Sequence, residues 1–403
     1  MRPVFCRMLL LGGLSLGLAA WNATLCFSAD PEAPSEPELQ TLLEQLASDD
    51  PDVRAAAAMA LGRLAAEPET VLPGLIELFD DRAPAQVEGS RAEVWYFAAL
   101  AAGDYGEAVV PSVIDLLQQD DRQRRTGASL VIMVLGPAAK DVLPALIEAL
   151  QTADLETRRP ALMSALLSLG VEAKPAMPLM LDFLDDEDFH TQYWACRVFG
   201  AIGPEAQVAV PQLVTLVQHS TASVRRNAAA ALGRIGPGIG PDALEALVRA
   251  LNDPVQPVRE QAAIALGRLG DFAQPAAPAL EEVLKDESSF AARSKAAEAL
   301  WRLNPDSPTP LRVLVTQVQG TEEAEVAAVV LGEIGNDLGA AELLLPLLES
   351  PDPRTRIHVA WALGLMGQHT QQALTVLEGF LDDPEPDYRN EAQVALNQIR
   401  RRD

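Results

Sequence analysis

Residues 224–236, with the sequence VRRNAAAALGRIG, carry the pattern that decides the fold. The pattern returns as VREQAAIALGRLG at 258–270 and as VRAAAAMALGRL at 53–64. Its apolar residues are spaced so that they share one face of a helix. In the first stretch they are Val224, Ala228, Ala231, Leu232 and Ile235. The pattern predicts a helix whose thin apolar face lets a neighbouring helix approach closely.

The Leu of the Ala-Leu-Gly element marks a repeat of about 34 residues. The equivalent positions are Leu61, Leu100, Ile132, Leu166, Phe199, Leu232, Leu266, Leu300, Leu331, Leu363 and Leu396. Repeats of this length are typical of helical hairpins, which cannot bury their apolar face alone and therefore stack on one another. About eleven such units fill residues 38–403 and leave no room for a second globular domain.

Prolines about twelve residues after the anchor Leu predict a second, shorter helix in most units, since proline is favoured in the first helical turn. They are Pro73, Pro111, Pro144, Pro178, Pro211 and Pro278. Turns with acidic residues then open the next long helix. The second unit departs from this pattern and carries an expanded turn between Asp81 and Arg91.

The recurring motif Asp-Pro-x-x-Val-Arg-x-x-Ala-Ala-x-Ala-Leu-Gly-x-Leu-Gly resembles the HEAT repeat over Leu39–Asp403. Its short period is most similar to the HEAT-like repeats first described in phycobilisome lyases. The resemblance implies an all-α, right-handed α-solenoid, a superhelix of helical hairpins. It also implies that the arginine seven residues before the anchor pairs with the turn Asp and nearby carbonyls. This arginine is present as Arg54, Arg125, Arg159, Arg225, Arg259, Arg293, Arg356 and Arg389. Because the motif encodes stacking, it does not indicate a function.

Composition agrees with a helical protein of small side chains. Of the 403 residues, 49% are apolar and only 5% aromatic, which argues against an all-β fold. The 57 acidic residues outnumber the 31 Lys and Arg, for a net charge of -26. A nucleic-acid-binding protein carries the opposite balance, so we expect no nucleic-acid partner.

The first 29 residues predict a secretory signal peptide. Arg2 and Arg7 precede an apolar run over residues 8–20, and cleavage fits after Ser28 or Ala29. We expect an exported protein, periplasmic or secreted, with no membrane insertion once the signal is removed. An uncleaved N-terminal tether is the alternative, because apolar character continues to Phe27.

The mature chain is expected to begin with a disordered, Pro-rich acidic linker over residues 30–37. Removal of the signal takes away two arginines and no acid, so the net charge of -26 becomes -28. It also takes away Cys6 and Cys26. The remaining Cys196 can form no intramolecular disulfide, and it replaces an alanine of other units, so we interpret it as a small, partly buried filler.

A second stripe on the long helices lies five and two residues before the anchor and two after it. This i, i+3, i+7 spacing should face away from the core and line the concave wall of the solenoid. The predicted partner-binding residues on it are Trp95, Trp194, Arg197, Asn227, Arg234, Gln261, Arg268, Lys295, Arg302, His358 and Trp361.

Two subsets of this stripe have alternative interpretations. Arg234, Arg268 and Arg302 occur at 34-residue steps and are either solvated helix formers or a row that docks carboxylates. The aromatic residues are either exposed interface anchors or side chains absorbed by packing between repeats. They are Trp95, Trp194 and Trp361.

We find no catalytic or metal-binding pattern and expect no cofactor. Deoxyhypusine hydroxylase, a HEAT-like enzyme, binds iron through His-Glu pairs, and none follows His190, His219, His358 or His369 here. The sequence therefore predicts a non-enzymatic, monomeric scaffold that binds a protein or peptide partner on its concave face. The alternative is an enzyme or enzyme subunit of the HEAT-like lyase or metal-dependent oxidoreductase type.

Overall fold

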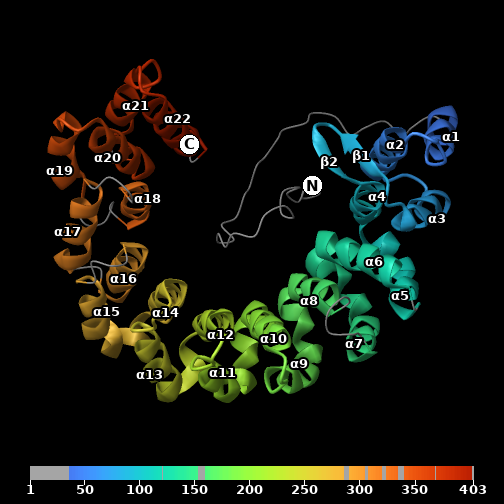
Figure 1. Cartoon of the computed structure of the whole chain (residues 1–403), viewed down its shortest axis with the longest axis horizontal. Coiled ribbons are helices and arrows are strands. Elements are labelled where there is room, and N and C mark those ends of the chain that lie inside the picture. The colour runs from blue at the N-terminus through green and yellow to red at the C-terminus, as the bar shows by residue number, and fades with distance from the viewer. Residues whose placement is uncertain are drawn as a thin grey trace. The chain divides into compact units, whose positions relative to one another are not determined.

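The computed structural model describes residues 36–119, 121–152, 159–285, 290–304, 307–319, 324–334, 340–367 and 369–401 (Figure 1). The predicted signal peptide and most of the predicted linker lie outside these residues. Helix α1 begins at Glu36, two residues before the predicted start of the solenoid. Contacts divide the chain into two compact units, Met1–Pro175 and Ala176–Asp403.

The first unit is a stack of helical hairpins in which long helices pack on long helices. Its long helices are α2 (Pro51–Leu64), α4 (Val94–Gly103), α6 (Arg122–Leu135) and α8 (Arg159–Ser168). The other helices are α1 (Glu36–Gln45), α3 (Pro68–Glu77), α5 (Val110–Gln118) and α7 (Leu143–Thr152). One described stretch, Arg122–Thr152, is apolar and long enough to cross a membrane by length and composition. Gly136, with φ 56°, ends α6 inside that stretch, and α7 then packs beside α8 as part of a repeat.

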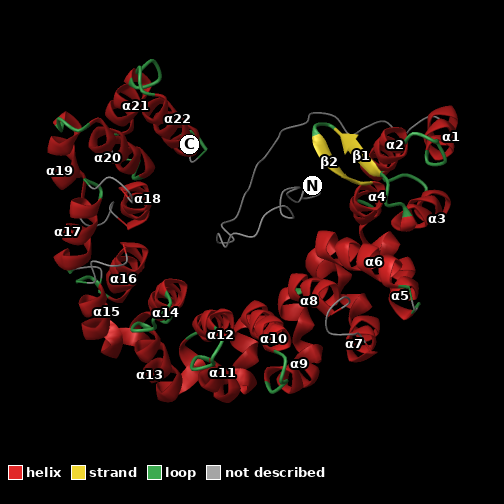
Figure 2. Ribbon diagram, viewed as in Figure 1, coloured by secondary structure: helices red, strands yellow, loops and turns green. Residues whose placement is uncertain are grey.

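The expanded turn of the second repeat, for which the sequence predicts no regular structure, folds as a β-hairpin. Strands β1 (Pro84–Val87) and β2 (Ser90–Glu93) pair antiparallel, and β1 packs against α2. Glu88 and Gly89 connect them with positive φ values of 49° and 82°. Figure 2 shows this hairpin in yellow among the helices.

The second unit repeats the same hairpin with greater regularity. Its long helices are α10 (Phe189–Ile202), α12 (Ala222–Ile235), α14 (Gln256–Arg268), α16 (Phe290–Leu303), α18 (Ala324–Ile334), α20 (Pro353–Leu365) and α22 (Pro386–Ile399). Its short helices are α9 (Met177–Leu184), α11 (Val210–Leu216), α13 (Gly240–Ala250), α15 (Ala277–Val283), α17 (Pro308–Gln317), α19 (Ala340–Leu344) and α21 (Thr370–Gly379). Consecutive long helices pack side by side, whereas consecutive short helices barely touch, so the long helices form the inner layer of this stack (Figure 1).

The predicted core columns are buried. In α12, Val224, Ala228, Ala231, Leu232 and Ile235 are at most 2% exposed. Small residues on this face bring neighbouring helices into near backbone contact. The expected all-α solenoid of stacked HEAT-like hairpins is therefore the fold of the described chain.

In five of the long helices the recurring arginine links the helix to the turn before it, as the resemblance implied. Its guanidinium donates to the carbonyl six residues earlier. These bonds join Arg54 to Ser48 (2.6 Å), Arg225 to His219 (2.9 Å), Arg259 to Asp253 (2.9 Å), Arg356 to Ser350 (2.6 Å) and Arg389 to Asp383 (2.6 Å). Arg54 and Arg225 also pair with Asp81 and Asp253 of the following repeat. The arginine column is thus a structural ladder.

The glycine after the anchor offers a matched test of the close packing. A Cβ on Gly233 would lie 2.6 Å from the Cα of Ala265, whereas a Cβ on Gly200 would lie 3.4 Å from the Cα of Ala231. We expect Gly233→Ala to lower the free energy of unfolding by about 1–2 kcal/mol, because overpacking outweighs the gain in helix propensity. Gly200→Ala should raise it by up to about 1 kcal/mol. Urea denaturation of both variants tests this, and equal stabilisation by both would contradict the packing.

Candidate partner-binding surface

The predicted stripe is divided between the two units, since Trp95 belongs to the first and the other predicted residues to the second. Trp95 is half-buried at the start of α4. Its indole Nε1 donates to Glu93 Oε2 at 2.7 Å, and the Arg82 guanidinium lies 5.5 Å from its ring centroid. The hydrogen bond from Arg82 is the main cause that lowers the pKa of Glu93, against a smaller effect of burial. Trp95 is therefore held by residues of the β-hairpin and its flank, in a different unit from the other predicted residues.

In the second unit we use the name long-helix face for the exposed side of the long helices carrying this stripe. Two predicted members do not lie on it, which corrects the prediction for them. His358 and Trp361 of α20 are only 4% and 1% exposed. They are covered because α20 packs against α18, α21 and α22. For Trp361, absorption by packing between repeats is thus the correct alternative.

The buried His358 is held in its neutral form. Its ring stacks on Trp361 with centroids 6.4 Å apart, and its Nε2 lies 3.7 Å from Glu391 Oε2. Burial, followed by the nearby charge of Arg354, lowers the pKa of His358 to about 4 despite the opposing effect of Asp352. His358 is therefore a buried polar residue between α20 and α22.

On α10 the stripe carries a cluster of two aromatic rings and an arginine. The Arg197 guanidinium carbon lies 4.5 Å from the ring centroid of Trp194 and 5.5 Å from that of Tyr193. Its Nη1 donates to the Tyr193 hydroxyl at 3.3 Å. All three side chains are half-buried. The cation–π contacts hold the guanidinium in one orientation and leave other N–H groups unused by these contacts.

Two further arginines follow on the next long helices. Arg234 on α12 and Arg268 on α14 are exposed. The stem of Arg234 crosses Gly200 of α10, because a Cβ at that glycine would lie 3.4 Å from Arg234 Cδ. Partial burial, and then the positive charges of Arg268 and Arg197, lower the pKa of Arg234. Arginine stays protonated in proteins, so the Arg234 guanidinium keeps its positive charge near those of Arg268 and Arg197.

In the predicted row of Arg234, Arg268 and Arg302, the last member is paired with a carboxylate, which corrects the prediction for Arg302. Glu298 accepts from Arg302 at 2.7 Å and from Lys295 at 2.9 Å, so both cations at this end of the face already have an acidic partner. The i, i+3 and i, i+4 spacings of these three residues were the signal in the sequence that would have revealed the pairing. Over the described residues, Arg197, Arg234 and Arg268 make no ion pair, and we call these three the arginine row.

The remaining predicted polar residues add little charge to the long-helix face. Asn227 is half-buried on α12 and donates from Nδ2 to the carbonyl of Ser223 at 2.7 Å. Gln261 is half-buried on α14. The arginine row beside Trp194 and Tyr193 is therefore the feature with the most distinctive chemistry on this face.

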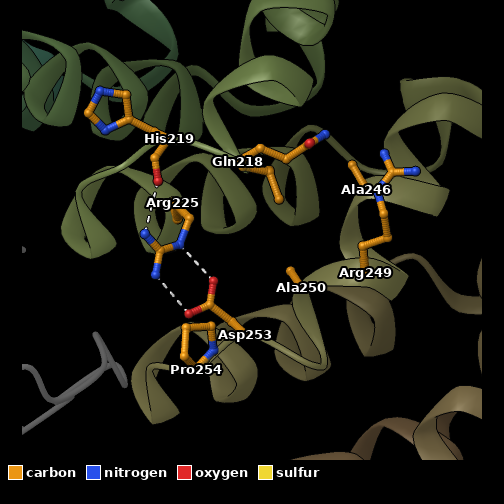
Figure 3. A pocket seen from close by; sticks show the side chains of 9 residues that line it. Gln218, His219, Arg225, Ala246, Arg249, Ala250, Asp253 and Pro254 are labelled. Carbon is orange, nitrogen blue, oxygen red and sulfur yellow. Dashed lines mark hydrogen bonds and ion pairs between the residues drawn. The ribbon is translucent and has the colours of Figure 1, made fainter.

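A cavity of about 300 Å³ opens elsewhere in the second unit, at the ends of α11 and α13 (Figure 3). Its main charges satisfy one another, because Arg225 Nε and Nη2 donate to Asp253 at 2.6 and 2.8 Å. Burial alone would raise the pKa of Asp253, but the bonds from Arg225 and the Val255 amide lower it overall. The cavity is therefore lined by Arg225 of the structural ladder and by its partner Asp253, whose charges already pair with each other.

The described part of the chain contains no group of three or more His, Cys, Asp or Glu residues arranged to hold a metal ion. Cys196 is fully buried in α10, and burial raises the pKa of its thiol, which disfavours the reactive thiolate.

Comparisons with known proteins agree with this architecture. HEAT repeats match residues 39–135, 143–229, 177–257, 210–301 and 311–397. A comparison with curated proteins finds no match. The fold is similar to that of Kap95p in a study of its binding to RanGDP, with TM-score 0.52 and 14% identity over 90% of this chain and 55% of that one.

Two other solved structures have lower TM-scores but higher sequence identity. Kap121p has TM-score 0.44 and 18% identity over 93% of this chain, which spans 46% of the karyopherin. A phycocyanin lyase chain from the Nostoc CpcE–CpcF complex has TM-score 0.34 and 24% identity over 69% of this chain and 99% of that one. At these identities the likeness concerns the fold alone. From the match over most of its length and the stacked hairpins, this chain belongs to the HEAT-repeat proteins.

Proposed function

We propose that this protein is an exported, non-enzymatic scaffold that binds a protein or peptide partner on the long-helix face of its second unit. The observation that carries the proposal is the arginine row, composed of Arg197, Arg234 and Arg268. These three cations lie on consecutive long helices of a chain with net charge -26, and no carboxylate of the described residues neutralises them. Such unpaired guanidinium groups suit the carboxylates of a partner.

The aromatic cluster adds a second kind of contact at one end of the row. Trp194 and Tyr193 are half-buried, so part of each ring is available to a partner beside the stacked Arg197. Tyr, Trp and Arg are the residues most enriched among the energetic centres of protein interfaces. A partner that covers this cluster would exclude water from it and strengthen its charge–charge contacts.

The test is recovery of the partner from the native compartment. Tagged wild-type protein and the variant Arg234→Ala/Arg268→Ala are purified from the envelope fraction, and co-purifying proteins are identified by mass spectrometry. We expect the variant to lose a protein that the wild type recovers. The matched control is Arg249→Ala/Arg312→Ala, which removes the same charge from exposed positions on the short helices α13 and α17. Equal recovery by both double variants would argue against the proposed face.

Export is supported by the N-terminal sequence, with its two arginines, apolar run and small residues before Asp30. The same purification tests it, because N-terminal sequencing of the recovered protein should begin at Ala29 or Asp30. An intact Met1 on protein fractionating with the cytoplasm would refute export.

A further inference from the structure

We infer that the arginine row binds an acidic peptide in the polyproline II conformation, with carboxylates at every third residue. This inference rests on the proposed function and deepens it by naming the chemistry and spacing of the partner segment. Arg197, Arg234 and Arg268 stand on α10, α12 and α14, which pack side by side in that order (Figure 1). A peptide that meets all three must therefore run across the helices.

The spacing of the row follows from the packing of its helices. Axes of packed helices lie about 8–10 Å apart. The near contact between Gly233 and Ala265 shows that α12 and α14 pack closely. Arg234 and Arg268 occupy equivalent positions of successive repeats, so their guanidinium groups are offset by about one helix spacing.

A polyproline II segment matches this offset, whereas a β-strand does not. Polyproline II has three residues per turn and a rise of about 3.1 Å, so side chains at every third residue share one side about 9 Å apart. On a β-strand, side chains on one side recur about every 6.6 Å. The equivalent pair Arg234 and Arg268 therefore favours carboxylates spaced i, i+3 on a polyproline II segment. Arg197 lies four positions earlier in its own repeat and offers the third cation, for a carboxylate at i+6.

Local geometry prepares two of the three arginines for this contact. Arg197 is oriented by its stack on Trp194 and its bond to Tyr193, so it loses little side-chain freedom when it meets a carboxylate. The stem of Arg234 is braced over Gly200. Beyond Arg268, the Glu298 carboxylate already accepts from both Arg302 and Lys295, so these two cations are engaged and the peptide track ends at α14.

Charge complementarity favours a peptide over a nucleic acid as the occupant. Three guanidinium groups on a chain of net charge -26 can neutralise a few carboxylates, but a nucleic acid would bring many phosphates against an acidic body. A short acidic segment concentrates its charge where the row lies.

The experiment measures fluorescence anisotropy of labelled peptides with the full mature chain at low salt. One peptide carries three glutamates at every third residue among prolines and alanines. A second has the same composition with glutamates at every second residue, and a third has lysines at every third. We expect the first to bind about tenfold more tightly than the second, and the third not to bind.

Variants then assign the contact to the row. Arg234→Ala and Arg268→Ala should each weaken the first peptide by about tenfold, the value of a charge-assisted hydrogen bond. Arg302→Ala is the matched control and should change affinity less than about twofold, because Glu298 already holds that side chain. Circular dichroism establishes that each variant keeps its helical content.

Several outcomes would overturn the inference: no binding of the first peptide, equal binding of the first two, equal loss in Arg302→Ala, or tighter binding of a single-stranded DNA of similar charge. These outcomes are separable from failure of the proposed function. If Arg234→Ala/Arg268→Ala still loses its partner in the envelope purification, the docking face stands and only the peptide chemistry is wrong.

Discussion

Replacing Trp361 with alanine should lower the local stability of α18, α20 and α22 by about 3–5 kcal/mol. Trp361 is among the largest fully buried side chains of the described chain, at 1% exposure. It belongs to one apolar cluster with buried residues of all three helices. Its removal would leave a cavity that the surrounding helices fill only in part, and the lost contacts add to that cost.

Hydrogen–deuterium exchange measures this effect where it occurs, which suits a stack of repeats that opens locally. Peptides from α20 and α22 should lose protection, while peptides from α12 keep theirs. Trp194→Ala is the control, since Trp194 is only half-buried and its ring contacts Tyr193 and Arg197 of the same helix. We expect it to cost less than about 2 kcal/mol. If Trp361→Ala loses no more stability than Trp194→Ala, the result would contradict the burial of Trp361 and favour its exposure on the long-helix face.

Arg225→Ala is the second change with a large expected effect, a loss of about 3 kcal/mol in the stability of α12 and α14. The side chains of Arg225 and Asp253 are only 12% and 8% exposed. Without the guanidinium, the Asp253 carboxylate keeps little solvent and loses its bidentate partner. The carbonyl of His219 also loses its donor. Exchange protection of α12 and α14 reports the effect.

Two comparisons isolate the ion pair from general damage. Arg249→Ala removes an arginine that is 50% exposed and bonded only within its helix, to Glu245, so it should cost less than about 0.5 kcal/mol. The double variant Arg225→Ala/Asp253→Ala should regain part of the loss, because no unpaired buried carboxylate remains. A double variant as unstable as the sum of the single ones would show that the pair contributes nothing.

The pH dependence of this loss follows from the lowered pKa of Asp253. A carboxyl whose pKa is lowered by folding contributes stability above its ordinary value, 3.8 here, and loses it as the pH falls through the folded value. The stability difference between wild type and Arg225→Ala should therefore narrow below about pH 3.8. A constant difference down to pH 2 would place the cost of the substitution outside the ion pair.

The repeat, the two helices of each unit and the core columns were predictable because they depend on local spacing. Leu232 and its partners share one helix face whatever the neighbouring helix presents, and their burial follows once the units stack. The arginine ladder was expected from the resemblance to HEAT repeats, and its contacts are local, because the carbonyl acceptor lies six residues away in the preceding turn.

The binding surface was predicted only in part, because exposure on the stripe depends on the helix that packs beside it. His358 and Trp361 occupy stripe positions, yet α22 and its Glu391 cover that side of α20. The Asp81–Arg91 turn forms part of a β-hairpin because β1 pairs with β2 and packs against α2. The pairing of Arg302 with Glu298 was visible in the sequence as an i, i+4 spacing.

For this protein, the sequence by itself determined an all-α stack of HEAT repeats, because a short period of apolar residues specifies both each helix and the face it buries. Only the tertiary structure decided which residues of the stripe are covered and which unpaired cations lie near one another. Arg197 and Arg234 are far apart in sequence, and their mutual repulsion arises because α10 and α12 pack together. The arginine row exists through that packing, since electrostatic interaction depends on distance in space.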